Sequence, residues 1–526
     1  KSVIKDICKK MNIDTKMLKE RAIMSKISSA KDELKTPDEF ELEAGNDYNL
    51  RRIAGVYREY QKTLKLNNAL DFDDLIFKTV ELFQSDAEVL EHYQDRFRYI
   101  MVDEYQDTNT SQFKLVAMLA AKYGNICVVG DDDQSIYKFR GANIYNILNF
   151  ENVFTGAKVI KLEQNYRSTQ TILNAANAVI SNNIGRKSKS LWTDNGEGEK
   201  VNYTLYENGY DEAEGVASGI AEYVRDGWNY NDVAILYRTN AQSRALEEKL
   251  MIHNIPYKIY GGQNFYQRKE IKDILAYLKT IDNGLDGQAV KRIINVPKRG
   301  IGNTTIDRLQ EYADFNDITF WEALVNAKDI DTIKNAALSK LEPFVDLIGR
   351  LRAKEEFMSL KELAEAVIED TGYIESLSQN ETVEEVEARR ENLDEFINKV
   401  VSYEEGCKEA GEEPTLSGLL EEVALIADID NLDESEPHVM LMTLHSAKGL
   451  EFPIVYMTGM EDGLFPSYMT IVSDDSTEIE EERRLCYVGI TRAEKILNLT
   501  SAKSRMVRGE TQMNKVSRFI NEIPKD

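Results

Sequence analysis

Two short apolar runs, each ending in carboxylates, constrain the fold of this chain more than any other feature. The first is YIMVDEYQD at 99–107 and the second is ICVVGDDDQ at 126–134. An apolar run that opens into a polar stretch is typical of a buried parallel strand followed by a loop. The segment between them, TSQFKLVAMLAAKYG, has helical spacing. This alternation of strand, helix and strand predicts an α/β fold.

A second α/β set follows along the chain. Its strand-like segments are AKVIKLEQNYRS (157–168), VNYTLYEN (201–208), DVAILYRTN (232–240), HVMLMTLHS (438–446), IVYMTGM (454–460) and ILNLTSAKS (496–504). Residues 1–68 have apolar residues at three-and-four spacing and predict helices. Between Gln263 and about Pro437 the pattern becomes nearly continuous amphipathic helix, which indicates a helical insertion that splits the second α/β domain.

Composition excludes several classes of protein. The 526 residues predict several domains, and 65 Lys and Arg against 91 Asp and Glu give a net charge of −26. That charge disfavours polyanion binding over the whole surface, although a local basic groove is compatible with it. There is no run of about 18 apolar residues, so no membrane span is expected. The cysteines show no CxxC spacing, which argues against a zinc site or a disulfide framework and favours the cytoplasm: Cys8, Cys127, Cys407 and Cys486.

The first candidate site is the pair Asp103 and Glu104 after YIMV. Two adjacent carboxylates at the end of a strand suit a nucleotide site, where one holds Mg²⁺ and the other orients the attacking water. The alternative is an acidic turn that caps the next helix.

The second candidate is GDDDQSIYKFRGA, which also leaves a strand and should emerge at the same sheet edge. The amide of Gln134 is suited to contact both a phosphate and a nucleophilic water. Tyr137, Phe139 and Arg140 place aromatic rings and a cation together, as stacking on single-stranded nucleic acid requires. The alternative is a Gly/Asp turn followed by an ordinary amphipathic strand.

Three further strings carry arginines or glycines near strand ends. QNYRS (164–168) offers Arg167, which is suited to stabilise a transferring phosphoryl group, and Tyr166, whose ring suits a nucleobase. Taken alone, a surface arginine capping a helix explains Arg167 better. TLHSAKGLEF (443–452) and ERRLCYVGITRA (482–493) follow, and the second carries Arg492 as another phosphate-reaching residue. As isolated patterns these two are a strand turn and an amphipathic helix.

The order and spacing of these five strings resemble the signature set of the superfamily 1 DNA helicases of the UvrD/Rep/PcrA type, from residue 1 to the end of the chain. FYQRKEIKDILAYL (265–278) resembles an additional motif of that group. The resemblance implies two RecA-like P-loop NTPase domains, each with a helical inserted subdomain, the first incomplete. The implied boundaries are a partial first insertion at 1–68, the C-terminal part of the first RecA-like domain at 69–163, the second RecA-like domain at 164–262 and 437–526, and its helical insertion at 263–436.

The resemblance also implies roles for single residues. For ATP and Mg²⁺ it implies metal binding and water activation by Asp103 and Glu104, γ-phosphate contacts by Gln134, Arg167 and Arg492, adenine stacking by Tyr166, ribose binding by Glu451 and a nucleotide contact at Gly449. For single-stranded DNA it implies contacts from Tyr137, Phe139, Arg140 and His445. Many relatives have Trp where this chain has Phe139, which keeps a stacking face of smaller area.

A turn in the helical insertion, VPKRGIGNTT (296–305), is a candidate contact with duplex DNA. Two glycines flank Ile301 next to two cations, so backbone N–H groups and positive charge can meet phosphates. In the family this segment resembles the duplex-contacting turn, which implies roles for Lys298, Arg299, Gly300 and Gly302. The alternative is a plain helix-to-helix turn.

The phosphate-cradling loop G-x-x-x-x-G-K-[ST] does not occur in residues 1–526. In the family this motif lies upstream of the position where residue 1 aligns. We therefore expect a helicase chain that lacks its N-terminal part and is inactive in ATP hydrolysis by itself.

The sequence as a whole predicts part of an ATP-dependent 3′-to-5′ DNA helicase that moves on single-stranded DNA and unwinds duplexes in repair or replication. We expect single-stranded DNA and a duplex junction as partners, together with proteins of repair or transcription, and a monomer or weak dimer with no membrane association. One alternative is a non-enzymatic DNA- or partner-binding module on the same scaffold. A helicase–nuclease subunit is the least favoured, because it needs a further domain.

Overall fold

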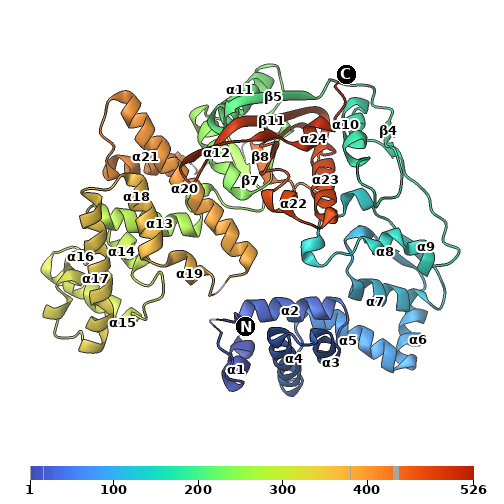
Figure 1. Cartoon of the computed structure of the whole chain (residues 1–526), viewed down its shortest axis with the longest axis horizontal. Helices are drawn as coiled ribbons and strands as arrows, with labels where there is room; N and C mark the ends of the chain where they lie inside the picture. The colour runs from blue at the N-terminus through green and yellow to red at the C-terminus, as the bar shows by residue number, and fades with distance from the viewer. Residues whose placement is uncertain (1, 16, 380, 430–436, 526) are drawn as a thin grey trace. The chain divides into compact units, whose positions relative to one another are not determined.

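The computed structural model describes residues 2–15, 17–379, 381–429 and 437–525 (Figure 1). The chain forms two compact units, which are described separately. The first comprises residues 1–198, 469–491 and 521–526, and the second comprises 199–468 and 492–520. Among the described residues, no helix combines the length and the apolar character needed to cross a membrane.

The first unit begins with a group of four helices, which confirms the helical prediction for residues 1–68. They are α1 (Ser2–Lys10), α2 (Glu20–Asp32), α3 (Pro37–Ala44) and α4 (Tyr48–Leu66). Residues at helical spacing, such as Ile23 and Ile27 on α2 and Ile53 and Tyr57 on α4, are buried in one core. Thr36 starts α3 with a reciprocal capping box to Glu39.

The predicted strand–helix–strand unit follows α5 (Phe72–Ser85) and α6 (Ala87–Arg96). Strands β1 (Ile100–Val102) and β2 (Ile126–Val128) pair in parallel, and α7 (Thr110–Ala120) connects them. The prediction that these strands are buried was wrong, because the side chain of Met101 is 81% exposed and Cys127 is also exposed. Met101 and Cys127 are paired neighbours in this two-stranded sheet and both are exposed, so the face that they share lacks cover.

The remaining elements of the first unit are short except for the helices α10 (Gln170–Ile180) and α23 (Ser476–Ile490). The short ones are α8 (Tyr145–Leu148), α9 (Phe150–Val153), β3 (Gln164–Asn165), β4 (Trp192–Thr193) and α22 (Tyr468–Val472). The strand expected over 157–168 was wrong except for Gln164–Asn165, which pairs with β4. Ile160 and Leu162 are largely exposed. A strand needs a neighbour for its backbone hydrogen bonds, and among the described strands only β4 pairs with this segment.

The second unit contains a seven-stranded sheet with the order β12-β11-β9-β6-β8-β7, and β5 also pairs with β11. The central strand β6 is buried at all five residues. Helices α11 (Gly209–Arg225) and α12 (Ser243–Ile252) share a core with the sheet. The strands are β5 (Asn202–Asn208), β6 (Val233–Tyr237), β7 (Tyr257–Ile259), β8 (Val439–Thr443), β9 (Phe452–Met457), β11 (Ala493–Val507) and β12 (Glu510–Met513). Apart from β12, these strands pair in parallel, which confirms the second α/β set.

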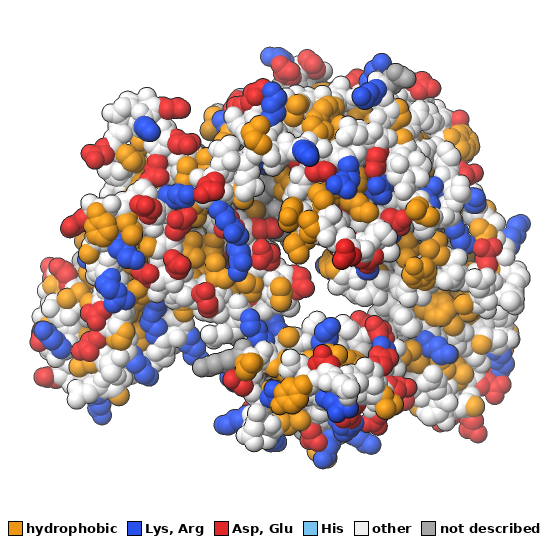
Figure 2. Space-filling view, in the orientation of Figure 1, with side chains coloured by type: hydrophobic (Ala, Val, Ile, Leu, Met, Phe, Trp, Pro, Cys, Tyr) orange, Lys and Arg blue, Asp and Glu red, His pale blue; other side chains and the backbone are white. Residues whose placement is uncertain are grey.

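A helical body separates β7 from β8 in the sequence, as the insertion pattern predicted. Its helices are α13 (Lys269–Asp282), α14 (Gly287–Ile293), α15 (Asn303–Asn316), α16 (Phe320–Val325), α17 (Asn335–Glu355), α18 (Leu360–Asp370), α19 (Tyr373–Leu377), α20 (Val383–Ala410) and α21 (Leu416–Ile429). They enclose one large hydrophobic core. Acidic and basic side chains are interspersed over the surface of these helices (Figure 2). A small antiparallel pair, β10 (Glu461–Asp462) with β13 (Lys515–Val516), and α24 (Arg518–Asn521) complete the fold.

The mixed α/β architecture with parallel sheets agrees with the expected pair of RecA-like domains. The domain boundaries drawn from the sequence stay a prediction. Residues 164–198, assigned above to the second RecA-like domain, belong to the first compact unit together with α23, on which α10 packs.

Candidate nucleotide and nucleic-acid sites

The loops after β1 and β2 leave the sheet at the same edge. The backbone N–H of Val129 donates to the carbonyl of Val102 at 2.8 Å, and that of Tyr105 donates to the carbonyl of Val129 at 3.0 Å. Parallel pairing therefore places the pair Asp103 and Glu104 beside the loop that starts at Gly130. Both carboxylate residues are exposed at this edge. Oxygen ligands of this kind fit Mg²⁺, which prefers carboxylates and water.

Gln106, which the sequence reasoning did not single out, joins the two loops. Its side chain is fully buried. Its Nε2 donates to Glu104 Oε2 at 2.6 Å, and its Oε1 accepts the backbone N–H of Asp131 at 3.0 Å. Glu104 has a φ of 49°, a left-handed conformation that is uncommon for a residue with a side chain and that recurs at functional sites.

Gly130 allows this close approach. A Cβ atom at this position would lie 2.4 Å from Gln106 Oε1 and 2.8 Å from Ile147 Cδ1. Both distances are shorter than van der Waals contact, so the loop accommodates only glycine without displacement. The glycine of GDDDQ is thus explained by packing against Gln106.

Gln134 is held in place by Asp131. Its Nε2 donates to Asp131 Oδ2 at 2.8 Å, and its backbone N–H donates to the Asp131 carbonyl at 2.9 Å. Because Asp131 also accepts from Asp133 N at 3.0 Å, the carboxylate organises the short helix η2 (Asp132–Gln134). The position of Gln134 therefore depends on what fixes Asp131.

Two cations from a later segment hold these aspartates, and we refer to them with the three aspartates as the aspartate clamp. Lys189 Nζ lies 2.7, 2.9 and 2.7 Å from carboxylate oxygens of Asp131, Asp132 and Asp133. Arg186 makes a two-nitrogen contact with Asp133, at 2.9 Å from Nε and 2.6 Å from Nη2. The side chain of Asp133 is 1% exposed.

The opposite charges within the aspartate clamp shift the pKa values of its two cations. Burial acts to lower the pKa of Lys189, but the three aspartates outweigh it and hold the pKa above its usual range. The hydrogen bonds from Asp133 raise the pKa of Arg186. Three carboxylates this close together have the donor set of a metal site, yet the ammonium group of Lys189 lies among them. The cluster therefore acts as a salt-bridged support.

The aromatic residues after Gln134 form a cation–π group. The ring centroids of Tyr137 and Phe139 are 6.0 Å apart, and Arg140 Cζ lies 5.3 and 5.5 Å from them. Phe139 is 64% exposed, so its ring is accessible for stacking. The segment forms the 3-10 helix η3 (Lys138–Arg140), which corrects the alternative of an amphipathic strand.

Two acidic side chains lie next to this segment. Lys138 Nζ lies 3.2 Å from Asp475 Oδ2, just before α23. Asp32 lies next to Gly141, where a Cβ atom would be 3.2 Å from Asp32 Oδ2. The other carboxylate oxygen, Asp32 Oδ1, accepts from Asn109 Nδ2 at 2.8 Å. Burial and the nearby Asp73 and Glu33 raise the pKa of Asp32 to about 6.

Arg167 lies in a turn before α10. Asn165 Oδ1 accepts the backbone N–H groups of Arg167 and Ser168 at 2.9 and 2.8 Å. The guanidinium Nη1 donates to the Thr491 carbonyl at 3.2 Å. Because the N-cap of α10 is Thr169, the alternative role of Arg167 as a helix cap is not supported. Tyr166 is 79% exposed and offers a free ring face to a ligand.

In the second unit, Arg492 is tied to the loop that carries the other nucleotide candidates. Its side chain is almost completely buried, and Nη1 donates to the Leu450 carbonyl at 3.1 Å. Its carbonyl accepts the N–H of Phe452 at 3.0 Å. Gly449 has a φ of 85°, and Glu451 is exposed. His445 stands earlier in the same loop, after β8. The structure thus places Arg492 beside the loop that carries Gly449 and Glu451.

The turn at 296–305 has an inner and an outer side. Lys298 is exposed, Gly300 has a φ of 74°, and Gly302 is the N-cap of α15. Asn295, which the sequence reasoning missed, closes the turn by pairing its side-chain amide with the backbone of Ile301. The helix N-terminus and Lys298 agree with the expected anion contact.

Arg299 departs from the expectation that it faces phosphates. Its Nη1 donates to the carbonyls of Ile293 and Ile294 at 2.9 and 3.2 Å, and its Nη2 donates to the hydroxyl of Tyr277 at 2.6 Å. The guanidinium also lies 4.9 Å from the ring centroid of Phe344. The guanidinium is turned inward because it satisfies carbonyls left at the end of α14. Lys340, whose Nζ donates to the Gly300 carbonyl at 2.9 Å, is the further cation on the turn.

Comparisons with known proteins agree with this arrangement. Residues 1–155 match the model of the UvrD/REP helicase N-terminal domain, and residues 160–504 match that of the UvrD-like helicase C-terminal domain. The chain is 51% identical over 524 residues to the ATP-dependent DNA helicase PcrA of Staphylococcus aureus, covering 100% of this chain and 71% of the relative. The PcrA of Staphylococcus epidermidis is 50% identical over 526 residues with the same coverage. On these grounds the chain belongs to the UvrD/Rep family of helicases and is of the PcrA type.

Proposed function

We propose that this chain is part of an ATP-dependent DNA helicase that moves 3′ to 5′ along single-stranded DNA and unwinds duplexes in repair or replication. One observation supports this most: the aspartate clamp fixes Gln134 at the sheet edge of Asp103 and Glu104, a few residues before the exposed ring of Phe139. A nucleotide sensor and a stacking surface therefore belong to one short segment. We infer that the protein works in the cytoplasm with ATP and Mg²⁺.

In this proposal Asp103 and Glu104 would hold Mg²⁺, which supplies charge neutralisation at the phosphates when bound. Glu104 orients the attacking water, and its carboxylate is itself oriented by Gln106. Gln134 contacts the γ-phosphate, and Arg167 and Arg492 supply positive charge to the transferring group. Tyr166 stacks on adenine, while Glu451 and the Gly449 backbone contact the ribose side of the nucleotide.

For DNA, we propose that Tyr137, Phe139, Arg140 and His445 contact the single strand. Lys298 and the backbone of Gly300 and Gly302 meet duplex phosphates at the junction. Arg299 acts from inside the turn, because its guanidinium is occupied by carbonyls and by Tyr277. Protein partners in repair or transcription, and a monomeric or weakly dimeric state, complete the proposal.

Residues 1–526 contain no G-x-x-x-x-G-K-[ST] segment. We therefore propose that these residues bind single-stranded DNA but do not hydrolyse ATP unless a phosphate-cradling segment is joined to them. The competing function is a non-enzymatic binding module.

Single-strand-stimulated ATP hydrolysis distinguishes the two. It should be measured on residues 1–526 and on a form extended upstream to include the family's phosphate loop. Turnover in the extended form alone supports the helicase, and Arg492→Ala should then abolish turnover while DNA affinity changes less than twofold. Absence of turnover in both forms, with DNA binding retained, would establish the binding module. Junctions with a 3′ or a 5′ tail test the direction of movement.

A further inference from the structure

A loop after α10, residues 183–189, connects the short helix η2 to α23 within the first unit. Asn183 Nδ2 donates to the Glu480 carbonyl at 2.9 Å, and the backbone N–H of Ile184 donates to Glu480 Oε1 at 2.9 Å. Asn183 Oδ1 also accepts from Arg483 Nη1 at 2.7 Å. Because Asn183 is buried, water competes little for these hydrogen bonds. The first part of the loop is therefore fixed to α23.

The second part of the loop holds the aspartates of η2. In addition to the side-chain contacts of the aspartate clamp, the backbone N–H of Lys187 donates to Asp132 Oδ2 at 2.8 Å. Arg186 Nη2 also donates to the carbonyl of Lys189 at 3.4 Å, so the two cations of the clamp are joined to each other. The loop therefore connects η2 to α23 through hydrogen bonds and ion pairs at both of its ends.

Helix α23 also contacts the segment that follows η2. The backbone N–H of Lys138 donates to Glu481 Oε1 at 3.1 Å, and Lys138 Nζ donates to Thr477 Oγ1 at 2.8 Å. Lys138 stands between Gln134 and Phe139 in the sequence. One helix therefore holds the phosphate-sensing and base-stacking segment in two places, directly at Lys138 and through the loop at η2.

Asp131 passes this restraint on to the amide of Gln134. Gln134 Nε2 donates to Asp131 Oδ2 at 2.8 Å. A carboxylate only accepts hydrogen bonds, so Asp131 determines on which side of the amide the nitrogen lies. The carboxylate is itself held by Lys189 Nζ at 2.7 Å. Such orientation matters in catalysis, because a displacement of about 1 Å can lower a rate roughly a hundredfold.

We propose that Lys189 and Arg186 are positioning residues for ATP hydrolysis, a role that rests on the helicase function proposed above. They orient the amide of Gln134 through the aspartates and connect it to α23, without touching the nucleotide. Their loss lowers kcat and leaves the KM for ATP nearly unchanged, because the misplaced amide stabilises the transition state less well.

Single-strand-stimulated ATP hydrolysis by the extended form tests this role with a double-mutant cycle. Lys189→Met and Gln134→Ala should each lower kcat at least tenfold, with the KM for ATP changed less than threefold. The double variant Lys189→Met/Gln134→Ala should have the kcat of Gln134→Ala alone, because both changes remove the same interaction. Lys189→Arg keeps the positive charge and should restore kcat to within threefold of the native value.

Asp131→Ala is a second variant, which keeps the test decisive if Lys189→Met folds poorly. It removes the residue between Lys189 and Gln134 but leaves Lys189 paired with Asp132 and Asp133. It should lower kcat as much as Lys189→Met does. Combined with Gln134→Ala, it should cause no further loss.

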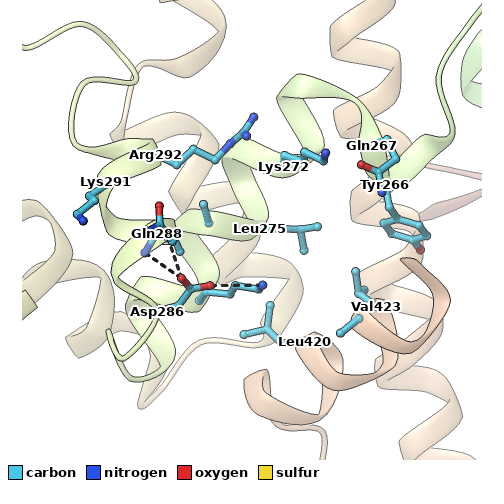
Figure 3. Close-up of a pocket in the computed structure, with 14 residues that line it drawn as sticks. Tyr266, Gln267, Lys272, Leu275, Asp286, Gln288, Lys291, Arg292, Leu420 and Val423 are labelled. Carbon is cyan, nitrogen blue, oxygen red and sulfur yellow. Dashed lines mark hydrogen bonds and ion pairs between the residues drawn. The ribbon is translucent and has the colours of Figure 1, made fainter. Parts of the chain in front are cut away.

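An exposed ion pair in the helical body of the second unit provides the matched control. Lys279 Nζ lies 3.7 Å from Oδ2 of Asp286, which lines a groove between α13, α14 and α21 (Figure 3). Lys279→Met therefore also removes a lysine from an ion pair. Lys187→Met makes the same change inside the loop, where the side chain pairs with Glu151. Both controls should keep kcat within twofold of the native value.

Hydrogen exchange on residues 1–526 provides a measurement that needs no turnover. The backbone N–H groups of Asp133 and Gln134 both donate to Asp131, so their exchange reports on its position. Lys189→Met should raise the exchange rate of the peptide 131–140 at least tenfold, with the exchange of α4 in the same unit unchanged. Lys279→Met should leave both unchanged.

Three results would overturn the proposed positioning role while leaving the helicase function intact. They are a native kcat for Lys189→Met and Asp131→Ala in an active extended form, losses that multiply in the double variant with Gln134→Ala, and native exchange of the peptide 131–140 in Lys189→Met. An extended form without any turnover would instead overturn the helicase function and the positioning role together.

Discussion

Lys189 and Asp131 form an ion pair, with Nζ 2.7 Å from a carboxylate oxygen, although they belong to segments far apart in the sequence. Asp131 in turn accepts from Gln134 Nε2 at 2.8 Å. A lysine that carries no nucleotide or DNA signature therefore determines where the candidate phosphate-sensing amide lies. The five predictions below test this network and the surfaces around it.

Lys189→Met should destabilise the first unit by about 3 kcal/mol at pH 7, because it leaves the buried Asp133 with fewer partners. Urea unfolding measures the loss. Since folding raises the pKa of Lys189, its stabilisation is complete below its ordinary pKa of about 10.4 and is lost only at more alkaline pH. Lys187→Met is the control, because Lys187 pairs with Glu151 at the surface, and about 0–1 kcal/mol is expected. Equal losses of stability in Lys189→Met and Lys187→Met would contradict the proposed role of the aspartate clamp.

Gly130→Ala should lower the free energy of unfolding by about 1–3 kcal/mol, because the new methyl group overlaps Gln106 Oε1 and Ile147 Cδ1. Gly349→Ala in α17 is the matched control, since a Cβ there meets no atom within 4 Å. That control should stabilise the chain by up to about 1 kcal/mol through helix propensity. Thermal unfolding of both variants checks the difference, and a neutral Gly130→Ala would refute the packing argument.

Asp32→Asn should stabilise the chain at pH 7 by about 1–2 kcal/mol, allowing for partial exposure. Burial raises the pKa of Asp32 to about 6, above its unfolded value of about 3.9, so the folded state binds more protons between these values. Stability therefore falls as pH rises from about 4 to 6, and the Asn variant should flatten this slope. Asn retains an acceptor for Asn109 Nδ2. Urea unfolding at several pH values measures the free energy of unfolding. An unchanged slope of this free energy against pH in the Asn variant would rule out Asp32 as the titrating group.

Phe139→Ala should weaken binding of single-stranded DNA by about 1–3 kcal/mol, because a stacking face is lost. Phe139→Trp should bind at least as tightly as the native chain, since the indole ring offers more area. Fluorescence anisotropy at fixed salt measures both. Phe357 is also exposed, at 74%, and lies on the helical body, so Phe357→Ala provides a control that should have no effect.

Lys298→Ala and Arg299→Ala should act differently although the residues are adjacent. Lys298→Ala should weaken junction DNA binding and reduce the salt dependence by about one phosphate contact, with stability unchanged. Arg299→Ala should lower the free energy of unfolding by about 2 kcal/mol, because buried carbonyls and the Tyr277 hydroxyl lose their donor. If Arg299→Ala instead weakened junction DNA binding and left the free energy of unfolding unchanged, Arg299 would be a DNA contact.

The sequence by itself determined the types of the elements and the order of the motifs. Strands β1 and β2, the helices of residues 1–68 and the helical insertion follow from apolar spacing and capping residues such as Thr36, which act between near neighbours. Parallel pairing then implied that Asp103 and Gln134 emerge at one sheet edge. These properties can be predicted from the sequence because they depend on short stretches of the chain.

Only the tertiary structure decided which side chains meet. Lys189 and Asp132 are 57 residues apart, and neither local spacing nor charge pattern marks them as partners. The same holds for the buried amide of Gln106, for the inward turn of Arg299 and for the exposed Met101. A polar group that loses water must find a partner wherever the fold brings one, and an apolar residue stays exposed where no element covers it. Both outcomes depend on long-range packing.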